Sequence, residues 1–197
     1  MKVLVVGATG LIGAGVAKEL GKRHEVVPAS RSSLISVDVN DPDSIAEMFQ
    51  RVGHVDAIVS CAGHVAFKEL ANLNREDYLH GFTDKVLGQV ELVNQGMHHL
   101  SDGGSITLTS GILGREPIKS GALAALANGA LESFVIAAAI DLPRGIRINI
   151  VSPTILKENE KAHSFFPGFE QVTLKQVTDA YVKSVDGWHT GQIFKVG

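Results

Sequence analysis

A glycine-rich turn near the start of the chain is the clearest pattern with a chemical meaning. Gly7-Ala8-Thr9-Gly10-Leu11-Ile12-Gly13 follows a short apolar run and opens a helical pattern. Glycines permit a tight turn there, and they let a pyrophosphate approach the backbone N–H groups at the positive end of the helix. We therefore predict a dinucleotide site formed by Gly7, Thr9, Gly10, Leu11 and Ile12. The alternative is a purely structural turn.

A second polar segment bears on which dinucleotide would bind. Ala29-Ser30-Arg31-Ser32 follows the next apolar run and contains no carboxylate. In dinucleotide-binding domains an acidic residue at this place accepts from the ribose of NAD, whereas an arginine accommodates the 2′-phosphate of NADP. One charge-assisted contact contributes about 1.5–3 kcal/mol, or roughly ten- to 150-fold in affinity. We expect Ser30, Arg31 and Ser32 to favour NADP over NAD, unless Arg31 is merely a solvated surface side chain.

The strands and helices that would position these residues are indicated by short apolar runs that alternate with amphipathic stretches. The runs are Val3 to Val6, Val26-Val27, Leu34-Ile35, Ala57 to Val59, Ile106 to Leu108 and Ile146 to Val151, with Gln192 to Val196 as a further candidate. Most are apolar on both faces, which is typical of parallel strands covered by helices on each side. The alternation predicts an α/β fold: one doubly wound Rossmann-type domain over residues 1–197, with a mostly parallel sheet of about seven strands flanked by helices.

Helix signals fill the gaps between these runs. Asp41-Pro42 is a good N-terminus, with Asp as the N-cap and Pro at the first helical position. Apolar residues in steps of three and four predict one long helix from Asn74 to Leu100, and a second long helix spans Ser120–Ile140. Gly103-Gly104 indicates a turn. His98-His99 would end the first long helix, where positive charge is favourable, and we predict no metal site there because adjacent residues do not share a helix face.

The order and spacing of several further motifs resemble the short-chain dehydrogenase/reductase family over nearly the whole chain. Ser60-Cys61-Ala62-Gly63 is similar to the family's Asn-Asn-Ala-Gly turn, and Asp38-Val39 resembles the pair that meets the adenine ring. Arg147 to Pro153 is similar to Arg-Val-Asn-x-Val-x-Pro-Gly, with Thr154 in place of the last Gly. The resemblance implies cofactor contacts from Asp38, Val39, Cys61, Ala62, Gly63 and Pro153.

The same resemblance indicates that two of the family's catalytic residues are absent from this chain. The family's catalytic helix usually contains Tyr-x-x-x-Lys-x-Ala-Leu-Glu-x-Phe, but Ala124 stands here for the Tyr and Asn128 for the Lys. In the family the Tyr is the general acid/base, the Lys lowers its pKa, a Ser polarises the carbonyl and an Asn supports a proton relay. The position of the Ser corresponds to Ser110 or Gly111, and that of the Asn to Lys85.

Two functions are compatible with this pattern. The first is an NADP(H)-dependent oxidoreductase that acts on an unknown carbonyl or alcohol with a non-standard active site. Hydride transfer belongs to the cofactor, so only a substitute proton donor is needed. Lys85 is the best candidate and His64 the second, while Ser110 would keep the family's role of polarising the carbonyl; the alternatives are a solvated lysine, a loop histidine and a turn serine. The second function is a non-catalytic dinucleotide-binding redox sensor or interaction protein.

Composition bears on the partners and the location of the protein. The net charge is -3 and there is no Lys/Arg run, so we expect no nucleic-acid partner. The longest apolar stretch, Ile118 to Ile140, contains Lys119, Asn128 and Glu132, so a buried helix is a better interpretation than a membrane span. Cys61 is the only cysteine, which excludes an intrachain disulfide and favours a cytoplasmic location.

Two further expectations concern assembly and substrate access. Small residues on the Ser120–Ile140 helix would let another helix approach closely, and the resemblance implies that the two long helices pair across a two-fold axis. We therefore expect a homodimer or homotetramer. The irregular segment Pro153 to Lys175 carries Phe165, Phe166 and Phe169, which either pack on the core or form a substrate lid.

Overall fold

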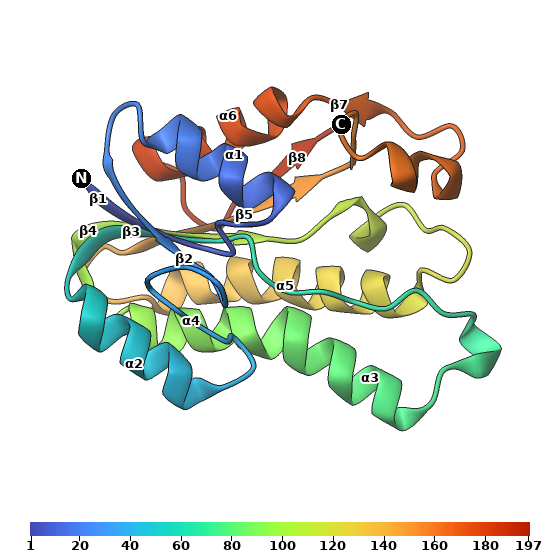
Figure 1. Cartoon of the computed structure of the whole chain (residues 1–197), viewed down its shortest axis with the longest axis horizontal. Helices are drawn as coiled ribbons and strands as arrows, with labels where there is room; N and C mark the ends of the chain where they lie inside the picture. The colour runs from blue at the N-terminus through green and yellow to red at the C-terminus, as the bar shows by residue number, and fades with distance from the viewer.

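The computed structural model describes residues 1–197 and has helices on both faces of a six-stranded parallel sheet (Figure 1). The strands are β1 (Lys2–Val6), β2 (Glu25–Ala29), β3 (Val55–Ser60), β4 (Leu100–Thr109), β5 (Arg147–Pro153) and β8 (Ile193–Val196), in the spatial order β2-β1-β3-β4-β5-β8. This is the doubly wound α/β architecture that the sequence predicts. The chain order reverses between β1 and β3, and a ligand cleft is expected at such a switch point.

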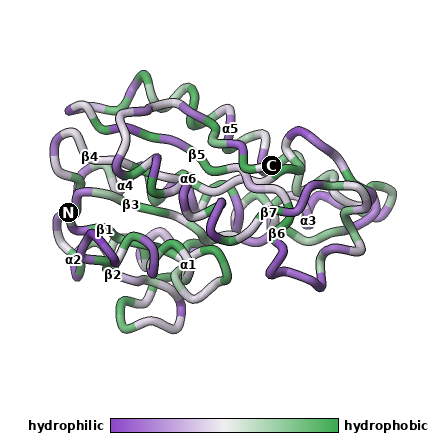
Figure 2. The backbone as a smooth tube through the Cα atoms, turned by 90° about the horizontal axis from the view of Figure 1, so that it is seen from above, coloured by the Kyte–Doolittle hydropathy of each residue, from purple (hydrophilic) through white to green (hydrophobic).

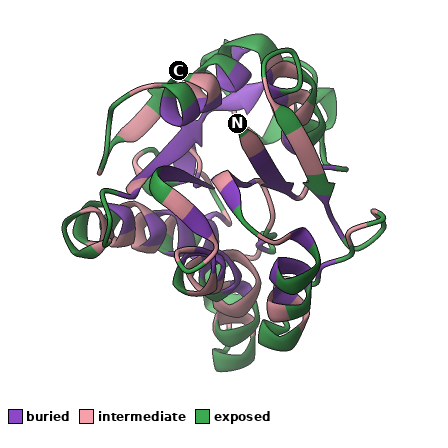
Figure 3. Cartoon of the chain, turned by 90° about the vertical axis from the view of Figure 1, so that its left-hand side faces the viewer, coloured by how far each residue is buried: buried purple, intermediate pink, exposed green.

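The helices divide between the two faces of the sheet. Helices α1 (Leu11–Leu20) and α6 (Leu174–Asp186) pack together on one face, above the sheet in Figure 1. Helices α2 (Pro42–Val52), α4 (Gly88–Gly96) and α5 (Ala122–Asp141) cover the other face, and α3 (Arg75–Phe82) extends beyond it. Each face therefore has its own hydrophobic core, of 27 and 13 buried residues. Buried strands lie between helices whose outer surfaces are exposed (Figure 3), and the path of β3 through the middle of the molecule is hydrophobic (Figure 2).

Six of the seven apolar runs expected as strands form the main sheet, close to the predicted number of about seven. Leu34-Ile35 forms no strand, and Ile35 makes only an isolated bridge with Ala29. The preceding serines form local hydrogen bonds: the Ser33 N–H donates to the Ser30 carbonyl, and the Ser30 and Ser33 hydroxyls lie 2.7 Å apart. These local bonds form a turn in place of an extended strand. Strands β6 (Ile155–Leu156) and β7 (Gln171–Val172) pair separately.

The predicted helix from Asn74 to Leu100 is also divided differently. It consists of α3, a π-helical segment η2 (Thr83–Leu87) and α4, which ends at Gly96. The chain then turns, so His98-His99 lies in that turn and Leu100 already begins β4, paired with Val55. Gly103 and Gly104, predicted as a turn before the strand, lie within β4 next to a register shift. Pairing of β4 with its neighbouring strands β3 and β5 therefore determines the conformation of Leu100, despite the helical periodicity, and of Gly103 and Gly104, despite their turn propensity.

The other helix predictions are close to the structure. Helix α2 begins as expected, since the Asp41 side chain accepts from the Asp43 N–H at 3.0 Å and Pro42 occupies the first turn. Helix α5 begins two residues after Ser120 and ends one residue after Ile140. Its length and hydropathy alone would suffice to cross a bilayer. One face of α5 nevertheless packs against β5 and the 3-10 turn η3 (Ile112–Gly114), which is the position of a core helix.

Candidate functional site

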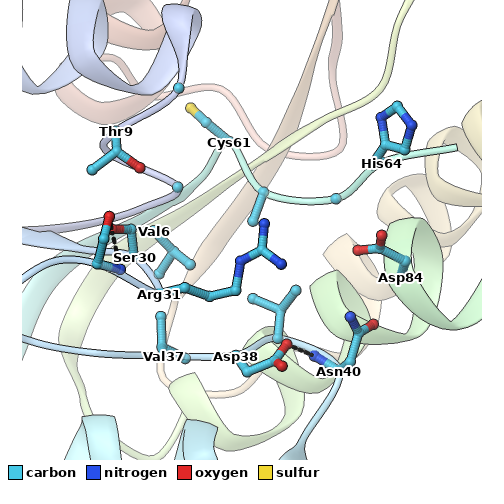
Figure 4. Close-up of a pocket in the computed structure, with 16 residues that line it drawn as sticks. Val6, Thr9, Ser30, Arg31, Val37, Asp38, Asn40, Cys61, His64 and Asp84 are labelled. Carbon is cyan, nitrogen blue, oxygen red and sulfur yellow. Dashed lines mark hydrogen bonds between the residues drawn. The ribbon is translucent and has the colours of Figure 1, made fainter.

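A cavity of about 310 Å³ opens at the carboxyl ends of β1, β2 and β3, at the switch point of the sheet (Figure 4). Its lining contains most of the predicted cofactor-binding residues, namely Gly7, Thr9, Gly10, Ser30, Arg31, Ser32, Asp38, Val39, Cys61, Ala62 and Gly63. It also contains four residues that the sequence did not single out, Val6, Val37, Asn40 and Asp84, together with His64, the second candidate proton donor. Leu11 and Ile12 are absent from the lining, because they already belong to the first turn of α1.

The glycine turn has the geometry of a phosphate cradle. Gly7 has φ +81°, and a Cβ there would lie 2.8 Å from the Cys61 carbonyl carbon. A Cβ at Gly13 would collide with the Gly7 carbonyl oxygen. Gly10 caps helix α1 without a side-chain hydrogen bond, so no side chain occupies the helix N-terminus. Free N–H groups at a helix N-terminus favour an anion, and this cradle fits a pyrophosphate.

The second polar segment lies where the sequence analysis expects it. Ser30 is buried and its Oγ accepts from the Ser32 N–H at 3.2 Å, which fixes the turn after β2. The Arg31 side chain extends from this turn into the cavity and has no carboxylate partner (Figure 4). Across the cavity, Asp38 accepts from the Asn40 N–H at 3.0 Å. An unpaired guanidinium beside the cradle fits a cofactor that carries an additional phosphate.

A second cavity of about 240 Å³ adjoins the first, and the two share Gly63 and His64. Its polar lining residues are His64, Lys85, Ser110, Asn128 and Thr154, and it contains no aspartate or glutamate. Its other lining residues are Gly63, Val65, Phe67, Gly111, Ile112, Leu113, Ala124, Pro153, Ile155 and Phe166. Both predicted catalytic residues, Lys85 and Ser110, are therefore brought together here. Pro153, predicted to contact the cofactor, lies in this second cavity.

Lys85 is placed by the π-helical segment and by the glycine that faces it. A Cβ at Gly63, whose φ is +106°, would lie 3.0 Å from Lys85 Cα and 3.2 Å from its Cδ. The Gln89 amide donates to the carbonyl oxygens of Lys85 at 3.1 Å and Thr109 at 2.9 Å, which ties this segment to the end of β4. Burial lowers the pKa of Lys85 to about 8, against a smaller opposing influence of Cys61 and Asp84. Wider π turns are frequent at functional sites.

Ser110 lines the cavity, but its hydroxyl group is hydrogen-bonded to a carboxylate outside the lining. Its Oγ donates to Glu132 Oε1 at 2.7 Å, and Ser152 Oγ donates to the same oxygen at 2.8 Å. Arg115 Nη1 donates in turn to Ser152 Oγ at 2.7 Å. Glu132 was not among the site residues predicted from the sequence. The structure shows that this carboxylate joins α5 to the ends of β4 and β5.

The two tyrosines and the cysteine lie elsewhere or are unreactive. Tyr181 is completely buried, its hydroxyl lies 2.6 Å from Thr109 Oγ1, and burial raises its pKa well above the usual value. Tyr78 lines a different surface hollow beside α3. Burial raises the pKa of Cys61 to about 11, which argues against a nucleophilic thiolate. Lys85 and His64 are therefore the two titratable proton donors that line the second cavity, and His64 also lines the first cavity, whereas Lys85 lines only the second.

The phenylalanine-rich segment contributes one side chain to the site. Phe166 lines the second cavity and packs edge-to-face on Phe169, with ring centroids 5.4 Å apart. Phe165 is exposed and does not line the cavity. Phe166 and Phe169 pack on the core, as the first interpretation expects, and Phe166 also forms a wall of the cavity.

Comparisons with known proteins agree on one family. A short-chain dehydrogenase/reductase family model described as enoyl-(acyl carrier protein) reductase matches residues 7–186. Versicolorin reductase 1 of Dothistroma septosporum is 29% identical over 205 residues, which cover 89% of this chain and 78% of that protein. A hydroxynaphthalene reductase-like protein of Metarhizium brunneum is 31% identical over 176 residues, covering 76% of this chain and 66% of that protein.

Solved structures give the same result. The protein lin1944 from Listeria innocua superposes with a TM-score of 0.98 at 45% identity, and all of both chains is covered. A small-chain dehydrogenase in complex with NADPH superposes with a TM-score of 0.88 at 27% identity, covering 100% of this chain and 96% of that one.

Proposed function

This chain belongs to the short-chain dehydrogenase/reductase family, and we propose that it is an NADP(H)-dependent oxidoreductase acting on a carbonyl or alcohol substrate with a non-standard active site. The observation that carries this proposal is the junction of the two cavities at Gly63 and His64. A dinucleotide with its pyrophosphate on the glycine cradle can extend along the first cavity to this junction. Its nicotinamide would then face the second cavity, where Lys85 lies.

NADP is favoured over NAD by the charges at the far end of the first cavity. Arg31 is the cationic side chain there, and no acidic residue follows β2 to accept from a ribose 2′-hydroxyl. The similar small-chain dehydrogenase was solved with NADPH, which supports the same choice. Gly7, Thr9, Gly10 and the uncapped start of α1 would hold the pyrophosphate, while Asp38 and Val39 would line the adenine end.

Lys85 would supply the proton. When bound, NADPH provides a hydride for the substrate carbon. The protein must then protonate the substrate oxygen, and a group whose pKa is about 8 is well matched to that task near neutral pH. Ala124 has only a methyl group in place of the family's tyrosine, which leaves room for the lysine or the substrate.

The cofactor part of this proposal can be tested without a known substrate. Wild-type protein and Arg31→Asp are titrated calorimetrically with NADPH and NADH. We expect Arg31→Asp to weaken NADPH binding by roughly ten- to 150-fold and to change NADH binding little, because only NADPH has a 2′-phosphate to repel. Equal losses for both cofactors would show that Arg31 does not recognise the phosphate.

The second candidate function is a non-catalytic dinucleotide-binding sensor or interaction protein. Two observations favour it: Ala124 and Asn128 occupy the usual Tyr and Lys positions, and the hydroxyl proton of Ser110 is directed to Glu132. Such a protein would bind NADPH tightly but would not consume it with any carbonyl compound.

A further inference from the structure

Three polar side chains in the second cavity, those of Asn128, Lys85 and His64, have no hydrogen-bond or ion-pair partner in the protein. The Asn128 side chain is buried, with only 6% of the residue exposed, although most buried amides are bonded. A Cβ built at Gly111 would lie 3.4 Å from Asn128 Nδ2, so the amide is directed at the glycine wall of the cavity. Lys85 lies on the π-helical segment, and His64 lies at the junction with the first cavity.

The charge of Lys85 is not balanced inside this cavity. No carboxylate lines the cavity, and Asp84, the acid next to Lys85 in sequence, lines the cofactor cavity instead. Glu132 lies behind Ser110, where it already accepts from two hydroxyl groups. An amide without a protein partner and a cation with no carboxylate in contact, both at one small cavity, are the groups that would bind an anionic oxygen.

We propose that Asn128 is a second catalytic residue, and that its amide and the Lys85 ammonium together bind the substrate oxygen on which negative charge develops. The site would therefore prefer ligands with an anionic oxygen to neutral ligands of the same shape. This inference rests on the proposed function, because the bound oxygen is that of the carbonyl being reduced.

The reaction balances with these two residues. A hydride adds to the carbonyl carbon, and the electron pair of the C–O π bond moves to the oxygen. The Asn128 N–H donates a hydrogen bond to this oxygen, and Lys85 transfers one proton from Nζ to it. The products are the alcohol, NADP⁺ and a neutral amine on Lys85, which regains its proton from water.

Benzoate and benzamide test the preference directly, because they have nearly the same shape and only benzoate is charged. Their binding is measured by saturation-transfer NMR with the protein alone and with the NADP⁺-saturated protein, between about pH 6.5 and 9.5. We expect wild-type protein at pH 7 to bind benzoate at least about tenfold more tightly than benzamide. The preference should decline as pH rises above about 8, where Lys85 loses its proton. The titratable groups facing Lys85 are Cys61 and His64 from the turn after β3, and Asp84 beside it.

Variants separate the two contributions. Lys85→Met should abolish the preference for benzoate, whereas Lys18→Met, on the exposed side of α1, should retain it. Asn128→Leu should weaken benzoate binding about tenfold, Asn128→Asp should weaken it further by repulsion, and Asn94→Ala on the exposed side of α4 should have no effect. Thermal unfolding identifies any variant that fails to fold, and the pH dependence of wild-type protein needs no variant.

The outcomes distinguish this inference from the proposed function. Equal affinities of folded wild-type protein for benzoate and benzamide would overturn the oxygen site, even if NADPH binds as expected. So would a benzoate affinity that both folded Asn128 variants leave unchanged. Failure to bind NADPH would overturn the proposed function, whereas a benzoate preference retained without cofactor would still support the oxygen site.

Discussion

At the residue scale, the chemistry of the site depends on the side chains that line it in place of the family's usual tyrosine and lysine. Lys85, Ser110, Ala124 and Asn128 were singled out from the sequence through their positions in family motifs, and the structure gathers all four at one cavity. Their individual partners could not be predicted. That Ser110 faces Glu132 depends on how α5 packs on β4 and β5, which no local pattern of residues encodes. The missing partners of Lys85 and Asn128 are equally a property of packing.

The single cysteine provides a residue-scale prediction. Burial raises the pKa of Cys61 to about 11, so hardly any thiolate is present near neutral pH. We expect iodoacetamide at pH 8 to alkylate folded protein about two orders of magnitude more slowly than protein unfolded in urea, because the thiolate is the reactive form. Mass spectrometry over time measures both rates. Similar rates in the two states would mean that Cys61 is accessible and ionised.

At the element scale, periodicity predicted where helices lie better than how they are divided. The steps of apolar residues from Asn74 onward persist through α3, η2 and α4, so the sequence gives no sign of the π-helical segment at Thr83–Leu87. That segment depends on tertiary contacts, namely the Gln89 amide on the end of β4 and the close approach of Gly63. The element that carries Lys85 was therefore predicted as a helix, but its local geometry was not.

The Glu132 network gives an element-scale prediction. Glu132→Ala removes the acceptor shared by Ser110 and Ser152, so helix α5 loses its polar link to β4 and β5. We expect the free energy of unfolding to fall by about 1–3 kcal/mol. Glu132→Gln keeps one acceptor oxygen and should lose less. Urea unfolding measures both variants, with Ser133→Ala at the exposed neighbouring position as the control. An unchanged unfolding midpoint for Glu132→Ala would show that the network does not stabilise the fold.

At the scale of the whole molecule, the sequence predicted the architecture because apolar runs and amphipathic helical stretches alternate along the entire chain. Runs apolar on both faces indicated a parallel sheet, and the glycine turn after the first strand, which indicated a dinucleotide site, lies at the edge of the first cavity. The miscounted strand, Leu34-Ile35, was too short for its apolar character to outweigh the serine turn beside it.

Assembly is the whole-molecule prediction. Five large apolar side chains are exposed on the helical layer formed by α3, η2 and α5, namely Leu79, Leu87, Leu126, Ile136 and Ile140. We propose that a second copy of this chain covers this layer in a homodimer or homotetramer. Multi-angle light scattering at micromolar concentration should report an oligomer. The double change Ile136→Glu and Ile140→Glu should yield monomers, whereas Leu34→Glu, at an exposed residue in the loop after β2, should not. Monomeric wild-type protein would contradict this prediction.

The central claim is that this chain consumes NADPH with Lys85 as the proton donor. The most direct measurement is steady-state NADPH oxidation by wild-type protein, Lys85→Met and Lys18→Met. The substrates would be a panel of ketones and quinones that includes hydroxylated aromatics, since one similar protein is named for hydroxynaphthalene reduction. We expect wild-type turnover that declines as pH rises through about 8, because reduction requires the Lys85 ammonium. Lys85→Met should lose about 10²–10⁴-fold in rate, and Lys18→Met should match the wild type. Tight NADPH binding without consumption by any substrate, or full activity of Lys85→Met, would contradict the claim.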